Sequence, residues 1–301
     1  MMVSLDHLSP EIQELAKKPG EVRIDRILAD HWIGYTRAND AIERLEWLLR
    51  HPKKMRMPNL LLVGPTNNGK TVITERFRRQ HGRAKSPDPS IDVFPVLCVQ
   101  TPNTADPRRF YNGILTALGA PERPGDALAK KEQQARLLLE KTGVRILVID
   151  EIHNILAGTT TQLNQMLNLF RFLGNELKIP LVAVGVKEAL QAIHSDDQLA
   201  NRFEPFALPR WEHGAEFNNL LATFEYTLPL QRASSLRDSA FATRVLAMSE
   251  GILGEIVTLI TRSAELAVKT GAERIDLGVL DRVNYLPPSQ RRASATAMRI
   301  D

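Results

Sequence analysis

Residues 64–71 read GPTNNGKT, which fits the pattern GxxxxGKT that holds the phosphates of a nucleotide. The glycines let backbone amides turn toward an anion, and a helix that starts here adds further N–H donors and a favourable dipole. We expect Lys70 to reach the β- and γ-phosphates of ATP and the Thr71 hydroxyl to ligate Mg²⁺. A plain glycine turn is the alternative. The predicted nucleotide-binding residues of this loop are Gly64, Pro65, Thr66, Asn67, Asn68, Gly69, Lys70 and Thr71.

An acidic pair, Asp150 and Glu151, follows the apolar run ILVI at 146–149. Ligands of open α/β sheets collect at the carboxyl ends of strands, which is where this run places the pair. We predict that Asp150 holds Mg²⁺ through water and that Glu151 polarises the attacking water. The alternative is that both acids cap the next helix. The phosphate loop upstream favours the metal-and-base interpretation, and His153 is interpreted as a helix-start residue near the site.

A parallel sheet would position both motifs, and the hydrophobic pattern predicts one. Short apolar runs that predict buried strands are NLLLVG, VFPVLCVQT, VRILVID, IPLVAVG and PFALP. Helical segments alternate with these runs up to Trp211, and only helices are predicted after it. We therefore expect an α/β fold in which a P-loop domain with a helix-flanked parallel sheet precedes a small helical lid. The predicted domains are an N-terminal polar segment at 1–30, the nucleotide-binding domain at 31–211, the lid at 212–286 and a loose tail at 287–301.

The composition fits a globular protein, with 43% hydrophobic and 25% charged residues, and disfavours disorder or a coiled coil. The net charge of +4 permits an anionic partner without requiring one. A single cysteine, Cys98, excludes an intrachain disulfide and a Cys-based zinc site. The chain shows no apolar run of membrane-spanning length and no secretory signal, so we expect a cytoplasmic protein without membrane contact.

The order of phosphate loop, acidic strand, fourth strand, arginine and helical lid resembles AAA+ ATPases. The resemblance implies that Arg202, in QLANRFEPF, is an arginine finger inserted into a neighbouring subunit's site, with Arg210 as the second candidate. A surface arginine paired with Glu204 or Asp197 is the alternative.

Two features depart from the AAA+ pattern. The fourth strand ends Val184-Gly185-Val186-Lys187, without the usual polar residue that senses the γ-phosphate, so Lys187 or a backbone group would replace it. The third lid helix offers Glu255, and later Arg262, where many lids place an arginine. These weak sensors predict slow, regulatory hydrolysis.

Five longer sequence segments make the resemblance more specific: they resemble the TniB and TnsC family of transposition regulators, AAA+ relatives of MuB and IstB. They are WIGYTRANDAIERLEWLL, MPNLLLVGPTNNGKT, VIDEIHNIL, LVAVGVKEAL and NRFEPFALPRW. The resemblance implies an ATP-dependent protein that forms a homo-oligomer, a ring or a filament, on double-stranded target DNA. It also implies contact with a target-selector protein and recruitment or stimulation of a transposase. Ile33 and Tyr35, with Trp32 and Gly34, would lie near the adenine. Packing of Trp32 and Tyr35 between the N-terminal segment and the core is the other interpretation, and the two are compatible.

Candidate DNA contacts are Asn103, Thr104, Arg108 and Arg109, which follow the second strand. Such contacts to phosphates would be indifferent to base sequence and sensitive to salt. Lys130 and Lys131 are weaker candidates, and the basic loop at 53–56 is interpreted as solvated or as subunit-interface charge.

Two other functions remain open. A helicase or initiator loader such as DnaC has the same motifs, and only the partner would separate it from a transposition regulator. A protein-remodelling ATPase is disfavoured, because TPNTADPRRF at 101–110 is polar and basic where a pore loop of such an enzyme would be aromatic.

Overall fold

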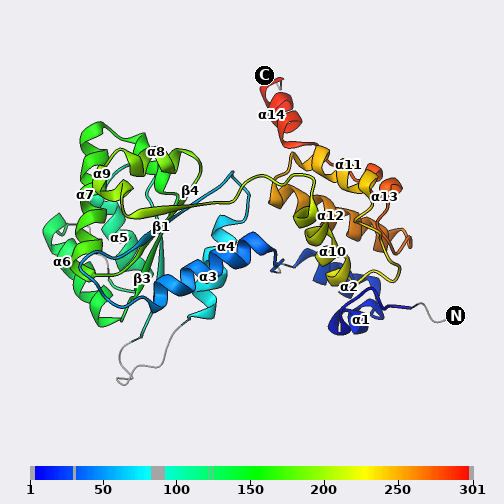
Figure 1. Ribbon diagram of the computed structural model, residues 1–301, viewed down its shortest axis with the longest axis horizontal. Helices are drawn as coiled ribbons and strands as arrows, with labels where there is room; N and C mark the ends of the chain where they lie inside the picture. The colour runs from blue at the N-terminus through cyan, green and yellow to red at the C-terminus, as the bar shows by residue number, and fades with distance from the viewer. Residues whose placement is uncertain (1–3, 30–31, 83–91, 122, 124, 298–301) are drawn as a thin grey trace. The chain divides into compact units, whose positions relative to one another are not determined.

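The computed structural model describes residues 4–29, 32–82, 92–121, 123 and 125–297. The chain forms two compact units, each with its own core (Figure 1). One unit combines Met1–Asn39 with Arg210–Asp301, and the other is Asp40–Pro209. In the described part of the chain, no helix has the length and apolar character needed to cross a membrane.

A five-stranded parallel sheet forms the centre of the unit Asp40–Pro209. Its strands are β1 (Asn59–Val63), β2 (Val96–Gln100), β3 (Ile146–Asp150), β4 (Leu181–Gly185) and β5 (Phe203–Ala207). They lie in the order β2-β3-β4-β1-β5, and every neighbouring pair is parallel. All five predicted strands are therefore confirmed. The two motif strands, β1 and β3, are separated by β4, so their carboxyl ends lie at one edge of the sheet with the β4 tip between them.

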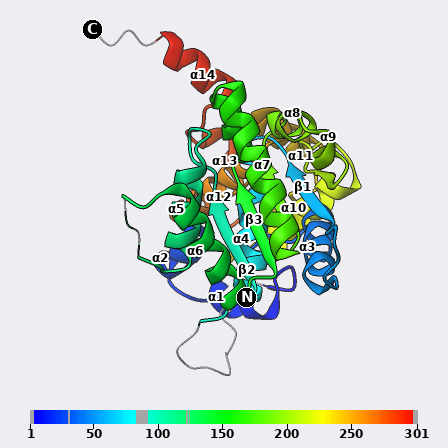
Figure 2. The ribbon, with the colours of Figure 1, turned by 90° about the vertical axis from the view of Figure 1, so that its left-hand side faces the viewer.

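Helices cover both faces of this sheet (Figures 1 and 2). Side chains such as Leu61, Leu147 and Ala183 join one buried cluster with the helices of the first face. Neighbouring strand residues such as Leu62 and Val182 point the other way and are also fully buried. The helices of the first face are α5 (Pro107–Ala117), α6 (Leu128–Lys141), α7 (Thr160–Leu177) and α8 (Glu188–His194).

The opposite face carries α4 (Lys70–Gln80), which packs against β2 and β4. In Figure 1, α3 (Thr36–Arg50) lies on the same side as α4. A 3₁₀ segment, η1 (Ile152–Ala157), follows β3 directly, and a short helix, α9 (Asp197–Ala200), precedes β5. The sequence analysis predicts neither α8 nor α9, because each is too short to show a clear helical period, whereas it places a helix start at His153, within η1.

The other unit is helical, as predicted for a lid. Its C-terminal part consists of α10 (Ala215–Thr227), α11 (Ser239–Ser249), α12 (Leu253–Lys269), α13 (Leu277–Arg282) and α14 (Pro288–Ala297). Its N-terminal part is α1 (Pro10–Ala16) and α2 (Gly20–Leu28). The observed division thus differs from the predicted one, because residues up to Asn39 group with the lid.

Packing explains why the N-terminal segment belongs to the lid. Ile27 of α2 is 2% exposed and shares a cluster with Phe217, Leu259 and other lid residues. Arg23 is 5% exposed, and its guanidinium lies 2.6 Å from the Glu273 carboxylate. A buried ion pair of this kind fixes α2 on the lid helices, since removing either partner would leave a charge buried and unpaired.

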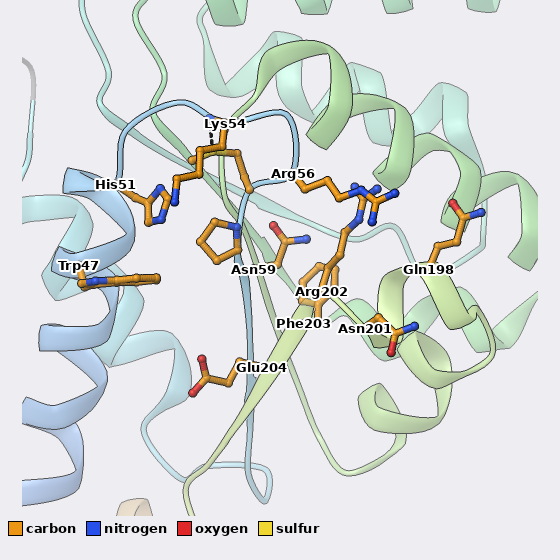
Figure 3. Close-up of a pocket in the computed structure, with 12 residues that line it drawn as sticks. Trp47, His51, Lys54, Arg56, Asn59, Gln198, Asn201, Arg202, Phe203 and Glu204 are labelled. Atoms are coloured by element: carbon orange, nitrogen blue, oxygen red, sulfur yellow. Dashed lines mark hydrogen bonds between the residues drawn. The ribbon is translucent and has the colours of Figure 1, made fainter.

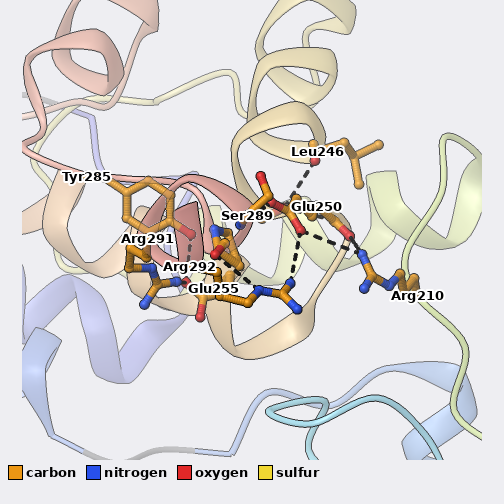
Figure 4. A network of polar contacts seen from close by, with 11 residues as sticks. Arg210, Leu246, Glu250, Glu255, Tyr285, Ser289, Arg291 and Arg292 are labelled. Carbon is orange, nitrogen blue, oxygen red and sulfur yellow. Dashed lines mark hydrogen bonds and ion pairs between the residues drawn. The ribbon is translucent and has the colours of Figure 1, made fainter. Parts of the chain in front are cut away.

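The predicted loose tail is a second difference, because residues 288–297 form α14. Two lid carboxylates hold this helix (Figure 4). The Ser289 amide donates to the Glu250 carboxylate at 2.7 Å, and hydrogen bonding by the side chain and then the backbone of Ser289 lowers the pKa of Glu250. Arg291 pairs with Glu255, a residue that is 8% exposed and also accepts a 2.6 Å hydrogen bond from the Tyr285 hydroxyl. Residues 298–301 of the predicted tail lie outside the described residues.

Candidate nucleotide site

The phosphate loop connects β1 to α4 through a backbone that requires its glycines. Gly69, at the N-cap of α4, has φ +85°, and Asn67 has φ +60°. A side chain on Gly64 would meet the carbonyl oxygen of Leu208 at 2.7 Å, so the loop can pass the end of β5 only as glycine. The loop has the strand–turn–helix context that its motif predicts.

Lys70 lies inside this loop and is 6% exposed. Its ammonium donates to the carbonyl oxygens of Gly64 at 2.9 Å and Pro65 at 2.7 Å. Burial lowers the pKa of Lys70, while the carboxylates of Glu151 and Asp150 act in the opposite direction. The loop therefore holds one buried cation at the start of α4, and such a cation suits a polyanion.

Asn68 anchors the loop. Its side chain is buried, and Nδ2 donates to the carbonyl oxygens of Leu208 at 2.9 Å and Pro209 at 3.0 Å. The Asn68 side chain therefore ties the phosphate loop to the two residues that follow β5. By contrast, Thr66, Asn67 and Thr71 are exposed.

The acidic pair meets the phosphate loop at the carboxyl end of β3. Thr71 Oγ1 donates to Asp150 Oδ2 at 2.9 Å, and the Glu151 amide donates to Asp150 Oδ1 at 2.8 Å. A hydroxyl and a carboxylate held this close are the hard oxygen donors that Mg²⁺ prefers. With Lys70 and the loop amides beside them, these residues fit a nucleotide with its magnesium ion.

His153 is closer to the chemistry than its sequence interpretation suggests. Its Nε2 lies 3.2 Å from the carboxylate of Glu151, a residue with φ +53°. Its Nδ1 is buried with no hydrogen-bond partner among the described residues. A side chain on Gly185, at the β4 tip, would meet His153 Nδ1 at 3.2 Å and the Ala189 side chain at 2.9 Å. His153 thus lies where the polar sensor was expected, and no pattern in the sequence indicates this.

Lys187, the predicted replacement for that sensor, has a different position. It is the N-cap residue of α8 and is exposed. The polar side chain beside the β4 tip is therefore His153, which lies in η1, two residues after Glu151.

The predicted DNA-binding residues are gathered on one exposed segment after β2. Asn103 and Thr104 lie in the loop, and Arg108 and Arg109 lie in the first turn of α5, where all four are exposed. Asp106 caps this helix by accepting hydrogen bonds from the amides of Arg108 at 2.8 Å and Arg109 at 3.3 Å. Both arginines are exposed, and Arg109 also pairs with the Asp106 carboxylate at 3.6 Å.

The same segment is hydrogen-bonded to the acidic motif. The amide of Thr101 donates to the Asp150 carbonyl at 2.8 Å, and Asn154 Nδ2 donates to the Thr101 carbonyl at 3.2 Å. Thr101 is 1% exposed, and its hydroxyl has no partner among the described residues. The sequence analysis did not single out Thr101 or Asn154.

The weaker DNA candidates are engaged elsewhere. Lys130 pairs with Asp126 at 2.8 Å. Lys131 is 1% exposed, and its ammonium donates to the Arg123 carbonyl at 3.0 Å, so it is not available at the surface.

Arg202 lies at the opposite end of the sheet from the phosphate loop. Its carbonyl accepts a hydrogen bond from Asn59, the first residue of β1, whereas the loop follows the last. The strand alone spans roughly 13 Å between these ends. The Arg202 guanidinium donates to Asn175 Oδ1 at 2.8 Å, and it forms no ion pair with Glu204 or Asp197, all of which are described residues.

The remaining candidates belong to the lid unit. Arg210 donates to the Glu250 carbonyl at 3.0 Å. Ile33 and Tyr35 pack against the lid cluster, and the Tyr35 ring centre is 5.0 Å from that of Trp211. Burial raises the pKa of Tyr35 to about 12. The packing is against lid residues, whereas the sequence analysis gives packing against the core, and the adenine contact stays a prediction.

The fold is that of the P-loop AAA+ ATPases, and the site fits a nucleotide with its magnesium ion. The chain also matches the model of the family described as Bacterial TniB protein over residues 23–213. It belongs to that family, as the sequence resemblance predicted.

Solved structures show the same fold at low sequence identity. The Aeropyrum pernix ORC1 protein in complex with DNA is 17% identical, with a TM-score of 0.56, over 90% of this chain and 69% of that one. The ORC2 protein of the same organism, in ADPNP-ADP complexes, is 16% identical, with a TM-score of 0.55, over 86% and 70%. Cdc6p from Pyrobaculum aerophilum is 14% identical, with a TM-score of 0.54, over 83% and 68%. The search of curated proteins found no match.

Proposed function

We propose that this chain is a regulator of DNA transposition that assembles on duplex DNA in its ATP state and recruits or activates a transposase. The observation that carries the proposal is the hydrogen bonding between Asp150 and Thr101, which joins the nucleotide site to an exposed basic segment. Membership of the TniB family supports transposition as the process. Hydrolysis then serves to release the assembly and is slow.

Each residue of the nucleotide site has a role in this proposal. Lys70 binds the β- and γ-phosphates, and Thr71 and Asp150 hold Mg²⁺, which neutralises charge on the phosphates. Glu151 orients and polarises the attacking water. His153, 3.2 Å from the Glu151 carboxylate, holds that side chain in place.

DNA binding is assigned to Asn103, Thr104, Arg108 and Arg109. They can contact phosphates without reading bases, so affinity is largely independent of sequence. Because Thr101 is hydrogen-bonded to both Asp150 and Asn154, a change at the acidic motif on hydrolysis reaches this segment directly. The similar ORC1 structure, which contains DNA, supports a DNA ligand for this fold.

The position of Arg202 supports assembly. The arginine and the phosphate loop are at opposite ends of β1, so an Arg202 that acts on a nucleotide would do so in a second copy. A contact of this head-to-tail kind closes into a ring or continues as a filament.

A helicase or initiator loader is the second candidate, favoured by the likeness to ORC1 and Cdc6p. That likeness is one of fold. Affinity purification separates the two functions, because a transposase and a target selector are the partners expected of a transposition regulator, whereas a loader would retain a helicase.

The direct test is duplex binding by fluorescence anisotropy with ATP, ADP and a non-hydrolysable analogue. We expect tight binding with ATP and the analogue and weak binding with ADP. For the two cationic contacts, Arg108 and Arg109, affinity should fall roughly tenfold between 50 and 200 mM salt. Equal affinity in all nucleotide states would refute the switch, and no binding in any state would favour a protein-remodelling ATPase.

A further inference from the structure

The segment Leu208–Trp211, which directly follows β5, connects the two compact units. The chain passes from the unit with the sheet to the helical unit between Pro209 and Arg210, and we call these four residues the linker. The linker lies at the opposite end of β5 from the pocket in Figure 3, whose lining includes Phe203, the first residue of β5. It therefore lies at the end of the sheet where the phosphate loop follows β1.

The first half of the linker is fastened to the phosphate loop. The Leu208 amide extends the pairing of β5 with β1 by donating to the Val63 carbonyl at 2.7 Å. Asn68, which is 2% exposed, donates to the carbonyl oxygens of Leu208 at 2.9 Å and Pro209 at 3.0 Å. An asparagine amide has two N–H groups, so the linker takes both. A side chain on Gly64 would meet the same Leu208 carbonyl at 2.7 Å, so this oxygen also lies against the start of the loop.

The second half of the linker is fastened to the lid, at the turn between α11 and α12. The Trp211 amide donates to the Gly251 carbonyl at 2.7 Å. The Arg210 guanidinium donates to the Glu250 carbonyl at 3.0 Å (Figure 4). Gly251 has φ +66°, and a side chain there would overlap the Trp211 carbonyl oxygen. Only glycine therefore lets this turn approach the linker so closely.

The Trp211 side chain extends this attachment into the lid core. Its ring centre lies 5.0 Å from that of Tyr35 and 6.1 Å from that of Phe217, which is fully buried. Because protein interiors are close-packed, a shift of the linker would displace these rings or open a void beside them. A displacement of the linker therefore reaches the core of the lid.

The lid residues that the sequence analysis considers as nucleotide sensors are held by other lid residues. Glu255 accepts a hydrogen bond from the Tyr285 hydroxyl at 2.6 Å and pairs with Arg291. The Arg262 guanidinium donates to the Asn284 carbonyl at 2.9 Å. These contacts hold both side chains within the lid, which makes the linker the better route from nucleotide to lid.

We propose that Asn68 is a positioning residue that couples the phosphate loop to the lid through the linker. This proposal rests on the phosphate-binding role given to the loop above and adds the route by which nucleotide occupancy reaches the helical unit. The ammonium of Lys70 donates to the Gly64 and Pro65 carbonyls, and phosphates that bind Lys70 compete with them for its N–H groups. A change at Gly64 meets the Leu208 carbonyl, and the linker must then follow the loop or lose the two hydrogen bonds from Asn68.

The hydrogen bonds of Asn68 make this coupling measurable. Leu208 is 2% exposed, and a buried carbonyl that loses its donor costs more free energy than a typical hydrogen bond contributes. A single neutral hydrogen bond corresponds to roughly fivefold in an equilibrium constant. Removal of both donors should therefore let the loop and the linker move independently.

The loop-side test compares Asn68→Ala with Asn164→Ala, which removes an exposed amide on α7. Hydrogen–deuterium exchange of the full chain is measured by mass spectrometry with and without a saturating non-hydrolysable ATP analogue. In the wild type and in Asn164→Ala, we expect the analogue to slow exchange in the phosphate loop and to alter exchange in α12. In Asn68→Ala the loop should stay protected, whereas the response of α12 should fall roughly fivefold or more. Asn68→Ser keeps one donor and should recover part of that response.

The lid-side test compares Gly251→Ala with Gly271→Ala. Both glycines belong to the lid and have φ +66° and +70°, but a side chain at Gly271 would meet nothing within 4 Å. Both variants therefore carry similar backbone strain, and only Gly251→Ala pushes the lid away from the linker. We expect Gly251→Ala to bind the analogue with wild-type affinity and to lose the response of α12, and Gly271→Ala to keep it. The double variant Asn68→Ala/Gly251→Ala should lose no more than either single variant, because both changes interrupt one route.

The outcomes separate this proposal from the proposed function. If Asn68→Ala or Gly251→Ala binds the analogue and its α12 responds as in the wild type, the lid senses nucleotide without the linker. The coupling is then wrong, and the assignment of the phosphate loop stands. If Asn68→Ala loses protection of the phosphate loop itself at saturating analogue, Asn68 only supports the loop, which also overturns the coupling. If the wild type does not bind the analogue, the nucleotide-binding part of the proposed function fails as well.

Discussion

The hydroxyl of Thr71 donates a 2.9 Å hydrogen bond to Asp150, although 79 positions separate the two residues in the chain. The contact joins the start of α4 to the end of β3. The strand that precedes α4 is β1, and β4 lies between β1 and β3 in the sheet. It places the two proposed Mg²⁺ ligands side by side. The predictions below begin from this contact.

Lys70→Ala should weaken ATP binding by roughly tenfold to a hundredfold, because it removes charge-assisted hydrogen bonds to the phosphates. The fold should survive, with the circular dichroism spectrum and melting temperature close to those of the wild type. Lys141→Ala, which removes an exposed charge at the end of α6, is the control. Unchanged ATP affinity in Lys70→Ala would contradict the assignment of the phosphate loop.

Glu151→Gln should bind ATP normally and lose most hydrolysis, since a positioned base contributes about 10²–10⁴-fold. Steady-state ATPase assays, with nucleotide affinity measured in parallel, check this. The same variant should remain on duplex DNA with ATP for longer than the wild type. Hydrolysis at the wild-type rate would mean that another residue is the base.

His153→Ala should lower kcat by roughly threefold to tenfold and leave the KM for ATP unchanged, because the 3.2 Å contact between its Nε2 and the Glu151 carboxylate is lost. His153→Asn keeps a side-chain donor and should recover part of kcat. A fall in melting temperature with an unchanged kcat would show that His153 only packs the tip of β4.

Arg202→Ala and Lys70→Ala should each abolish hydrolysis alone, and their mixture should recover part of it. Mixed assemblies contain interfaces at which an intact phosphate loop meets an intact Arg202. ATPase activity is measured over a series of mixing ratios, with co-assembly checked by a tag on one variant. Absence of recovery despite co-assembly counts against action between subunits.

Reversing two charges, in Arg108→Glu/Arg109→Glu, should weaken duplex binding and make it less dependent on salt, with ATP affinity nearly unchanged. Each phosphate contact that is lost should reduce the slope of log K against log salt by about 0.9. The control, Lys141→Glu/Arg145→Glu, makes the same charge change at exposed positions before β3, away from the loop. An equal loss of affinity in both variants would reflect net charge alone.

The local parts of this protein could be predicted from the sequence. The spacing of GPTNNGKT and the run ILVIDE each encode an element and its chemistry within a few residues, because glycine conformation, strand burial and helix start are short-range properties. The same holds for the five apolar strands.

Only the tertiary structure decided which distant residues meet. It placed β4 between the two motif strands, His153 against the tip of β4, and Arg202 at the far end of β1 from the phosphate loop. It also showed that the N-terminal helices pack with the lid helices, where Arg23 pairs with Glu273. Each of these facts depends on strand order or on side-chain pairing between residues far apart in the sequence. Hydrophobic periodicity indicates which face of an element is buried, but it does not indicate which other element covers that face.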